Sequence, residues 1–295
     1  MDIIIWMIIA VILVFIWVCA FDTNRFTVSR YEFTDPRIKR PVKAVFISDL
    51  HCKMFGYEGT FLVEKIKEIS PDLILVGGDL ITAHPGAGTD KVIEMLKHLA
   101  GFPIVYAFGN HELRLKLYPE TYGDTWKEYV KKLSEIGISI TENGIYRLEG
   151  TGIDIISFSA DREYYRRMKK ITMDPEYIRK TAGEFSPESF NILLAHNPAY
   201  FESYVSYGAD LTLSGHVHGG MVRIPGFRSK NSAAAERRMR GVISPSVTLF
   251  PEYDAGRFDR DGRTMIISRG LGTHTLPIRF LNPGELIVLD LKPPV

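Results

Sequence analysis

Five short apolar runs, each followed closely by polar residues of the kinds that bind metal ions, constrain the fold of this chain most strongly. Apolar runs with little alternation are typical of strands buried on both faces, as in α/β proteins. Glycines beside several of the polar residues let the backbone turn sharply there. Because ligands of open α/β sheets bind beyond the carboxyl ends of the strands, we expect these polar side chains to gather at one edge. The runs are residues 44–47, 73–76, 104–108, 192–195 and 211–213.

The polar residues after these runs offer nitrogen and oxygen donors without a thiolate. They are Asp49, His51, Asp79, Asn110, His196, His216 and His218. This donor set suits manganese, iron, zinc or cobalt, whereas calcium would require oxygen alone. Seven donors are too many for one tetrahedral ion but suit two divalent ions that share a carboxylate and keep positions open for water and substrate. The sequence therefore predicts a binuclear metal site.

The order and spacing of these motifs resemble the calcineurin-like metallophosphoesterases over roughly residues 43–291. The motifs are Asp49-x-His51, Gly78-Asp79, Gly109-Asn110-His111-Glu112, His196 and Gly215-His216-x-His218. More narrowly, residues 215–225, 268–272 and 277–280 are similar to the membrane-associated bacterial branch, which includes phosphodiesterases and some UDP-2,3-diacylglucosamine pyrophosphatases. The resemblance implies an α/β fold in which two mixed sheets form a four-layer α/β/β/α sandwich. It also implies in-line attack on a phosphate ester by a metal-activated hydroxide.

Carried over position by position, the resemblance assigns a role to each site residue. One metal would be held by Asp49, His51 and His218, the other by Asn110, His196 and His216, with Asp79 as the bridge. His111 would lie on the leaving-group side as general acid or charge stabiliser. Many relatives have an aspartate where this chain has Thr82, and a hydroxyl does not stabilise an imidazolium as a carboxylate does. His111 is therefore expected either to be less acidic or to be oriented by Glu112 or a backbone carbonyl.

The N-terminus is apolar enough to cross a bilayer. Residues 3–21 carry no charge, and their length is close to the roughly 20 residues that a membrane helix needs. Trp6 and Trp17 near the ends suit membrane interfaces. We therefore expect residues 1–21 to be a transmembrane anchor. One alternative is a cleaved signal peptide, with 18–20 as its cleavage site, but no Lys or Arg precedes the apolar core. A buried core helix is the other alternative.

Charge around the anchor predicts its orientation. No Lys or Arg precedes it, whereas six follow, and the positive-inside rule then places the catalytic domain in the cytoplasm of a single-pass cell-membrane protein. Export of the folded domain is the alternative. The six are Arg25, Arg30, Arg37, Lys39, Arg40 and Lys43. With only Cys19 and Cys52, one of them in the anchor, a disulfide-dependent extracellular fold is excluded.

The rest of the chain is predicted as a tether and one domain. Residues 22–42 would form the tether, which could add an edge strand through residues 31–33, and residues 43–295 the catalytic domain. Apolar spacing predicts helices over residues 60–69, 90–99 and 125–136. Asn143-Gly144 predicts a hairpin between residues 138–140 and 145–148. The second sheet is expected to hold this hairpin and to be completed by residues 153–158, 265–268 and 286–291.

Two basic segments are candidates for contact with substrate phosphates or lipid headgroups. A solvated surface is the alternative for each, and closeness to the loop of His216 favours the first. The first contains Arg223, Arg228, Lys230, Arg237, Arg238 and Arg240; the second contains Tyr164, Tyr165, Arg166, Arg167, Lys169 and Lys170.

These features favour a membrane-anchored phosphodiesterase or pyrophosphatase that uses two divalent ions (Mn, Fe or Zn). Its substrate would be a phosphodiester or pyrophosphate of a lipid or lipid-linked nucleotide. The net charge of +1 argues against a long phosphate backbone as ligand, so no stable nucleic-acid partner is expected. The alternatives are a nuclease or cyclic-nucleotide phosphodiesterase, a phosphoprotein phosphatase, and a non-catalytic membrane scaffold, which would have lost some metal ligands.

Overall fold

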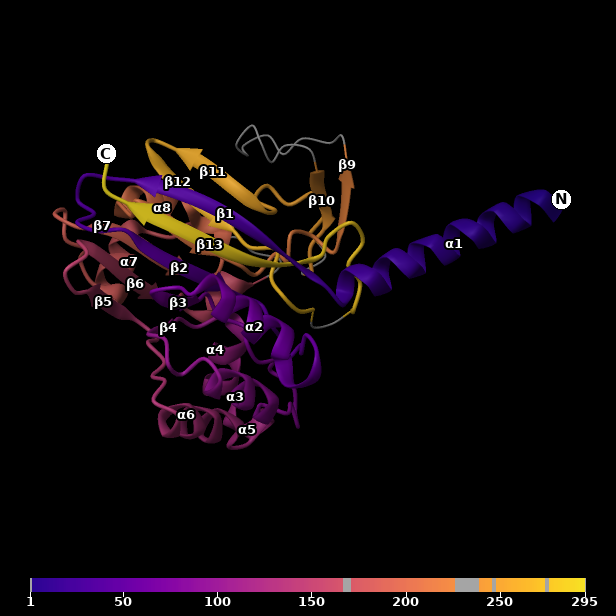
Figure 1. Ribbon diagram of the computed structural model, residues 1–295, viewed down its shortest axis with the longest axis horizontal. Coiled ribbons are helices and arrows are strands. Elements are labelled where there is room, and N and C mark those ends of the chain that lie inside the picture. Colours follow the sequence, from indigo (N-terminus) through magenta and orange to yellow (C-terminus); the bar gives the residue numbers. More distant parts are fainter. Residues whose placement is uncertain (1, 167–170, 226–238, 246–247, 274–275, 295) are drawn as a thin grey trace.

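The fold is a four-layer α/β/β/α sandwich, as the resemblance implied (Figure 1). The computed structural model describes residues 2–166, 171–225, 239–245, 248–273 and 276–294. Two mixed sheets pack face to face, and helices cover the outer face of each sheet.

The first sheet has five strands in the order β1-β13-β2-β3-β4. Strands β2, β3 and β4 run parallel, β13 is antiparallel to β2, and β1 runs parallel to β13 at the edge. The carboxyl ends of β2, β3 and β4 therefore meet at one edge of the sheet. The strands are β1 Phe26–Thr34, β2 Val42–Ile47, β3 Leu73–Val76, β4 Ile104–Tyr106 and β13 Gly284–Lys292.

The second sheet has six strands in the order β11-β12-β8-β7-β6-β5. Its inner strands β12, β8, β7 and β6 are parallel, and the outer strands β11 and β5 are antiparallel to their neighbours. The strands are β5 Gly144–Leu148, β6 Ile153–Phe158, β7 Phe190–Ala195, β8 Leu211–Ser214, β11 Gly256–Arg260 and β12 Arg263–Ile267. A separate two-stranded ribbon pairs β9 Val222–Pro225 with β10 Met239–Ile243.

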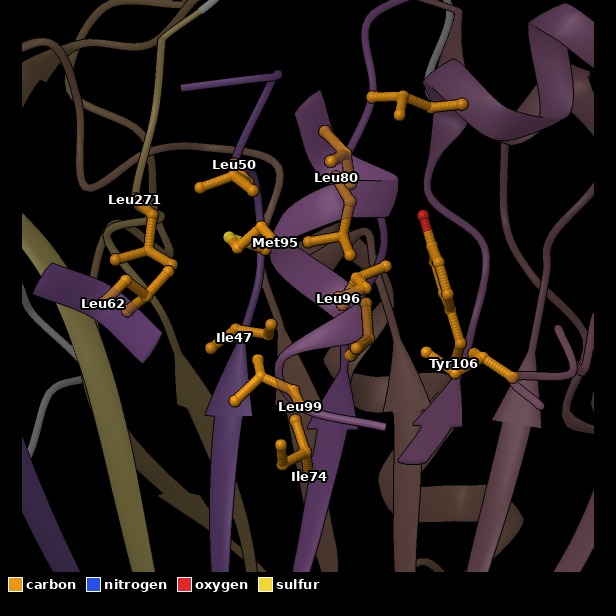
Figure 2. Packing of buried hydrophobic residues seen from close by; sticks show 14 of the residues in the cluster. Ile47, Leu50, Leu62, Ile74, Leu80, Met95, Leu96, Leu99, Tyr106 and Leu271 are labelled. Atoms are coloured by element: carbon orange, nitrogen blue, oxygen red, sulfur yellow. The ribbon is translucent and has the colours of Figure 1, made fainter. Parts of the chain in front are cut away.

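Alternation along the strands divides the buried side chains among the layers. In β2, Ala44 and Phe46 pack against the second sheet, whereas Val45 and Ile47 face the outer helices. Figure 2 shows part of the outer cluster, where Leu99 lies beside the strand residues Ile47 and Ile74, and Leu62 lies beside Leu271. The helices of this outer layer are α2 Thr60–Ile69, α3 Asp90–Lys97, α4 Asn110–Leu117, α5 Pro119–Tyr122 and α6 Thr125–Glu135.

Helices α7 and α8 cover the second sheet in the same way. α7 Pro175–Ala182 and α8 Phe201–Tyr207 bury their apolar side chains against the outward residues of β6, β7 and β12. The chain also contains the short 3-10 helices η1 Tyr57–Gly59, η2 Arg162–Tyr165 and η3 Pro198–Tyr200. Both sheets are therefore buried on two faces, which explains why their strands read as continuous apolar runs.

Helix α1 Asp2–Thr23 extends away from the sandwich (Figure 1). Of the described residues, it is the one helix long and apolar enough to cross a membrane, with a mean hydropathy of 3.2. Its end is bound to the domain, because the Asp22 carboxylate accepts the Asn282 backbone N–H at 3.0 Å and Phe15 stacks on Phe280 at 4.9 Å. Strand β1 Phe26–Thr34 lies within the segment 22–42 that was expected to be a tether, so nine of these residues are part of the sheet.

Two expectations about pairing are wrong. Residues 138–140 form no strand, and β5 instead pairs with β6 through the turn after Leu148, because Asn143-Gly144 lies at the start of β5. Residues 286–291 belong to β13 in the first sheet, where they pair with β2 and β1. An apolar strand buried on both faces fits either sheet by composition, so only its partners determine its place.

Candidate metal centre

All seven predicted metal-site residues lie together where the two sheets meet. Those of the first sheet follow β2, β3 and β4, and those of the second follow β7 and β8. Two compact groups have donor atoms within 4.8 Å of one another: Asp49 with His51 and His218, and Asp79 with His196 and His216. Asn110 begins α4 directly after β4. The parallel strands of both sheets therefore deliver the side chains to one place.

Unusual backbone conformations hold several of these residues. Of the eleven non-glycine residues with positive φ in the described part of the chain, five are predicted site residues. They are Asp49 (51°), His51 (49°), Asp79 (54°), His216 (71°) and His218 (52°). Such conformations cost free energy and persist where the surrounding structure fixes them, typically at functional sites.

Hydrogen bonds at Nδ1 set the tautomers of two histidines, His196 and His218. A backbone carbonyl can only accept, so an imidazole that bonds one through Nδ1 carries its proton there and leaves the Nε2 lone pair free when neutral. The contacts are His196 Nδ1 with Gly77 O at 2.7 Å and His218 Nδ1 with Gly272 O at 3.1 Å. His196 and His218 are therefore arranged to present Nε2 as a metal donor. His51 Nδ1 lies 3.3 Å from the Thr82 hydroxyl, which can donate or accept.

His111 has the opposite arrangement. Its Nδ1 accepts the backbone N–H of Ala83 at 2.8 Å, so in the neutral ring Nε2 carries the proton. This Nε2 lies 4.0 Å from Asp79 Oδ2, at the edge of the donor cluster. A backbone N–H thus orients His111, rather than Glu112 or a carbonyl, and Thr82 contacts His51 instead. The arrangement suits a hydrogen-bond donor better than a metal ligand.

Two further observations show that the site fits divalent cations. Asn110 Oδ1 is buried and has no hydrogen-bond partner among the described residues, so a ligand oxygen is left unsatisfied. The Nε2 atoms of His51 and His218 lie 3.2 Å apart, and His218 Nε2 lies 3.3 Å from Asp49 Oδ1, so these three atoms are close enough to bind one cation. Asp79 Oδ2 lies 3.1 Å from His196 Nε2 and 3.9 Å from His51 Nε2, between the two groups.

The buried carboxylates make the cluster attractive to positive charge. Burial alone would lower the pKa of His196, but the adjacent Asp79 and Asp49 raise it to about 10. Burial and the charge of His196 lower the pKa of His216 to about 3, so that ring stays neutral. Without metal the cluster takes up a proton, and a divalent ion would replace it.

Glu112 ties the loops of the first sheet together. Its buried carboxylate accepts four hydrogen bonds, from the backbone N–H groups of Asp79, Leu80 and Gly109 and from the Tyr106 hydroxyl. Burial and the nearby Asp79 charge raise the pKa of Glu112 to about 7. Sequence reasoning considered this residue only as a partner of His111. Its structural role in positioning Asp79 and Asn110 was missed.

Glu112→Ala is expected to destabilise the fold by about 3 kcal/mol or more, because three buried N–H donors would each lose their acceptor at about 1–3 kcal/mol. Urea unfolding monitored by circular dichroism measures the loss. Glu120→Ala on the exposed surface of α5 is the matched control and should change stability by less than about 0.5 kcal/mol. Equal stability of the two variants would contradict the role of Glu112.

Gly215→Ala is expected to weaken metal binding. A Cβ at this position would lie 2.1 Å from Asp49 Oδ2 and from Ser48 Oγ, so the carboxylate would have to move. When the groups that position a metal ligand are displaced, metal affinity typically falls about 10- to 100-fold. Titration with Mn²⁺ in a calorimeter measures this change. Gly101→Ala, where a Cβ meets no atom within 4 Å, should bind as the wild type does.

Two cavities adjoin the cluster. One, of about 260 Å³, is lined by tyrosines that include Tyr164, Tyr200 and Tyr253; the other, of about 380 Å³, contains Asp79 and His111. Tyr165 and Arg166 line both. The second basic segment therefore lies beside the site, at least through these residues.

The first basic segment has a structural role where the structure describes it. Arg223 is buried and donates to the Gly219 and Met239 carbonyls, and Arg240 donates to the Phe250 carbonyl. These two residues therefore do not support the expectation that the first basic segment contacts substrate phosphates or lipid headgroups. The other members of the two basic segments, Arg228, Lys230, Arg237, Arg238, Arg167, Lys169 and Lys170, lie outside the described residues.

Comparisons with known proteins agree with this site. The calcineurin-like phosphoesterase family matches residues 42–220. YkuE, an uncharacterized metallophosphoesterase of Bacillus subtilis, is 29% identical over 85% of this chain and 79% of its own length. The UDP-2,3-diacylglucosamine pyrophosphatase LpxG of Chlamydia muridarum is 22% identical over 95% and 93% of the two chains.

Solved structures of related proteins are more distant. A dimetal phosphatase from Danio rerio covers 80% of this chain and 88% of its own, with 12% identity and a TM-score of 0.39. The family match spans more than half of the chain and includes every predicted site residue. The chain therefore belongs to the calcineurin-like phosphoesterase family and is a hydrolase of phosphate esters.

Proposed function

We propose that this chain is a membrane-anchored phosphodiesterase or pyrophosphatase whose seven clustered residues hold two divalent ions. The tautomer pattern is the observation that carries the proposal, because His196 and His218 direct Nδ1–H at backbone carbonyls and leave Nε2 for a metal, whereas the neutral His111 ring presents an N–H at Nε2. Asp49, His51 and His218 would hold one ion, and Asn110, His196 and His216 the other. Asp79 would bridge them.

The residues of the site have different roles in the reaction. When bound, the two ions supply a water that is acidic enough to lose a proton near neutral pH, and positive charge for the phosphoryl oxygens. Asp49 and Asp79 would hold that charge in place. The carbonyls of Gly77 and Gly272 fix the orientation of the His196 and His218 rings. His111 Nε2–H donates a hydrogen bond to the departing oxygen, as general acid or charge stabiliser.

Hydrolysis of two chromogenic esters tests this function. Protein purified in detergent with Mn²⁺ is compared on bis-p-nitrophenyl phosphate, a diester, and p-nitrophenyl phosphate, a monoester. We expect preferential cleavage of the diester, with metal analysis giving two ions per chain. Monoester preference would indicate a phosphatase instead, and absence of both activities in the metal-loaded protein would leave an enzyme that accepts neither ester, or the scaffold.

The membrane part of the proposal rests on helix α1 and on the similarity to LpxG. The six basic residues that follow the apolar segment favour a cytoplasmic catalytic domain. Protease treatment of membrane vesicles tests this orientation. We expect digestion of the domain in inside-out vesicles and protection in right-side-out vesicles, and the reverse pattern would show that the domain is exported.

A further inference from the structure

A cavity of about 380 Å³ next to the metal centre has an unusually basic wall. Its lining includes the site residues Asp79, Asn110 and His111 and three arginines, Arg114, Arg162 and Arg166. These arginines come from two segments far apart in sequence, helix α4 and the turn η2, which the fold brings together. The cavity therefore begins at the reacting centre and continues into a positively charged region.

Tyrosine side chains orient two of the guanidinium groups. Arg114 Nη2 donates to the Tyr122 hydroxyl at 2.8 Å. Arg162 lies over the Tyr118 ring, 4.7 Å from its centroid, and donates to the Tyr118 hydroxyl. Both contacts leave most of the N–H donors of each guanidinium open, because a guanidinium has five. The two arginines are thus partly ordered before any ligand binds.

The positive charges on this wall are not neutralised by neighbouring carboxylates. Within the described ranges, none of the three arginines forms an ion pair, whereas Arg37 and Arg263, for comparison, pair with Asp210. Among the described residues that line the cavity, Asp79 is the one carboxylate, and it belongs to the metal centre. Unpaired guanidinium groups beside a site for one phosphoryl group favour a second anionic group in the same ligand.

We propose that this arginine wall binds the second phosphate of a diphosphate diester, so that the leaving group is itself a phosphomonoester. The inference rests on the proposed function and narrows it from phosphodiesters in general to pyrophosphate bonds. His111 lines the same cavity, and its Nε2 lies 4.0 Å from Asp79 Oδ2, so the proposal places the bridging oxygen beside this N–H. Guanidinium forks match the paired oxygens of a phosphate.

The reaction balances as an addition of water across the bridge. The water oxygen bonds to the phosphorus held at the metal cluster, and the bridging P–O bond breaks with its electron pair on the second phosphate. The two protons of water pass to the two phosphomonoester products or to solvent. A phosphate leaves as a stable anion, so the wall needs only to hold its charge, with a hydrogen bond from His111.

The test compares substrates that differ in the second phosphate. The wild type and the variants Arg114→Ala, Arg162→Ala and Arg166→Ala are assayed in detergent with Mn²⁺ on bis-p-nitrophenyl phosphate and on a nucleoside diphosphate sugar. We expect each variant to lower the ratio of kcat/KM for the diphosphate over the diester by about 10- to 100-fold, since a hydrogen bond to a charged group is lost. Arg162→Lys should recover part of the ratio.

The control is Lys116→Ala, also exposed on α4 but outside the cavity wall and paired with Glu142. It should leave both activities unchanged. An acylated diphosphate is assayed as a further substrate. The same loss of kcat/KM in the arginine variants with soluble and acylated diphosphates supports recognition of the diphosphate itself. A loss confined to the acylated substrate overturns the inference. Variants that cleave both substrates in the wild-type ratio overturn the inference but leave the proposed function intact. A wild type inactive on both would remove the proposed function and this inference together.

Discussion

Asp79→Ala is expected to abolish phosphoesterase activity and to remove both metal ions. Asp79 lies between the two donor groups, with Oδ2 3.1 Å from His196 Nε2 and 3.9 Å from His51 Nε2, so one side chain would serve both ions. Its loss also takes away a buried negative charge that offsets two divalent cations. Inductively coupled plasma mass spectrometry measures the metal per chain, and bis-p-nitrophenyl phosphate measures activity.

A second variant separates charge from structure. Asp79 Oδ1 accepts the backbone N–H of His111 at 2.8 Å, so alanine also removes a structural bond. Asp79→Asn keeps an oxygen for that bond but lacks the charge, and it should lose metal while unfolding close to the wild type. Asp90→Ala, on the exposed start of α3, is the surface control. Two metals per chain in Asp79→Ala would show that Asp79 does not bridge.

His111→Ala is expected to keep both metals and to lower turnover by about 100- to 10,000-fold, the usual contribution of a positioned proton donor. The reason is the hydrogen bond from Ala83 to Nδ1, which leaves an N–H at Nε2 in the neutral ring rather than a lone pair. Metal content and kcat are measured on the same preparation, so that the two effects are separated.

His98→Ala, at the exposed end of α3, is the control for removal of an imidazole and should match the wild type. The donor atoms of His51, Asp79 and His111 also lie within 4.8 Å of one another, so a metal-binding role for His111 is a real competitor. Loss of one metal in His111→Ala would favour that role, and unchanged turnover would end the assignment as proton donor.

The sequence predicted the site through its strands. Each donor directly follows a buried apolar run, and parallel strands carry such residues to one edge whichever sheet they belong to. Helices were also predictable where apolar residues recur at helical spacing: the expected 60–69 agrees with α2, and 90–99 exceeds α3 by two residues. These patterns involve residues that are close together in the sequence, so they can be recognised without knowing which distant segments pack against them.

Properties that depend on distant backbone atoms could not be predicted. The Nδ1 partner of His218 is the Gly272 carbonyl, 54 residues away, and no spacing rule connects them. Thr82 was noted for the aspartate that it replaces, yet its hydroxyl contacts His51 because the loop after β3 passes that ring. The place of β13 likewise depended on which strand pairs with it. Arg114 could have been noticed three residues after His111, but its role depends on the distant turn η2.

Helix α1 passes into strand β1 through only Asn24 and Arg25. Asn282, which binds the carboxylate at the end of this helix through its backbone N–H, also donates through its side chain to the carbonyl of His218 at 2.8 Å. The proposed anchor and the proposed catalytic loop therefore share one residue. In a membrane, the catalytic domain of such an enzyme would not move freely at the end of a flexible linker. It would work at one fixed height above the bilayer and would cleave only bonds presented at that height.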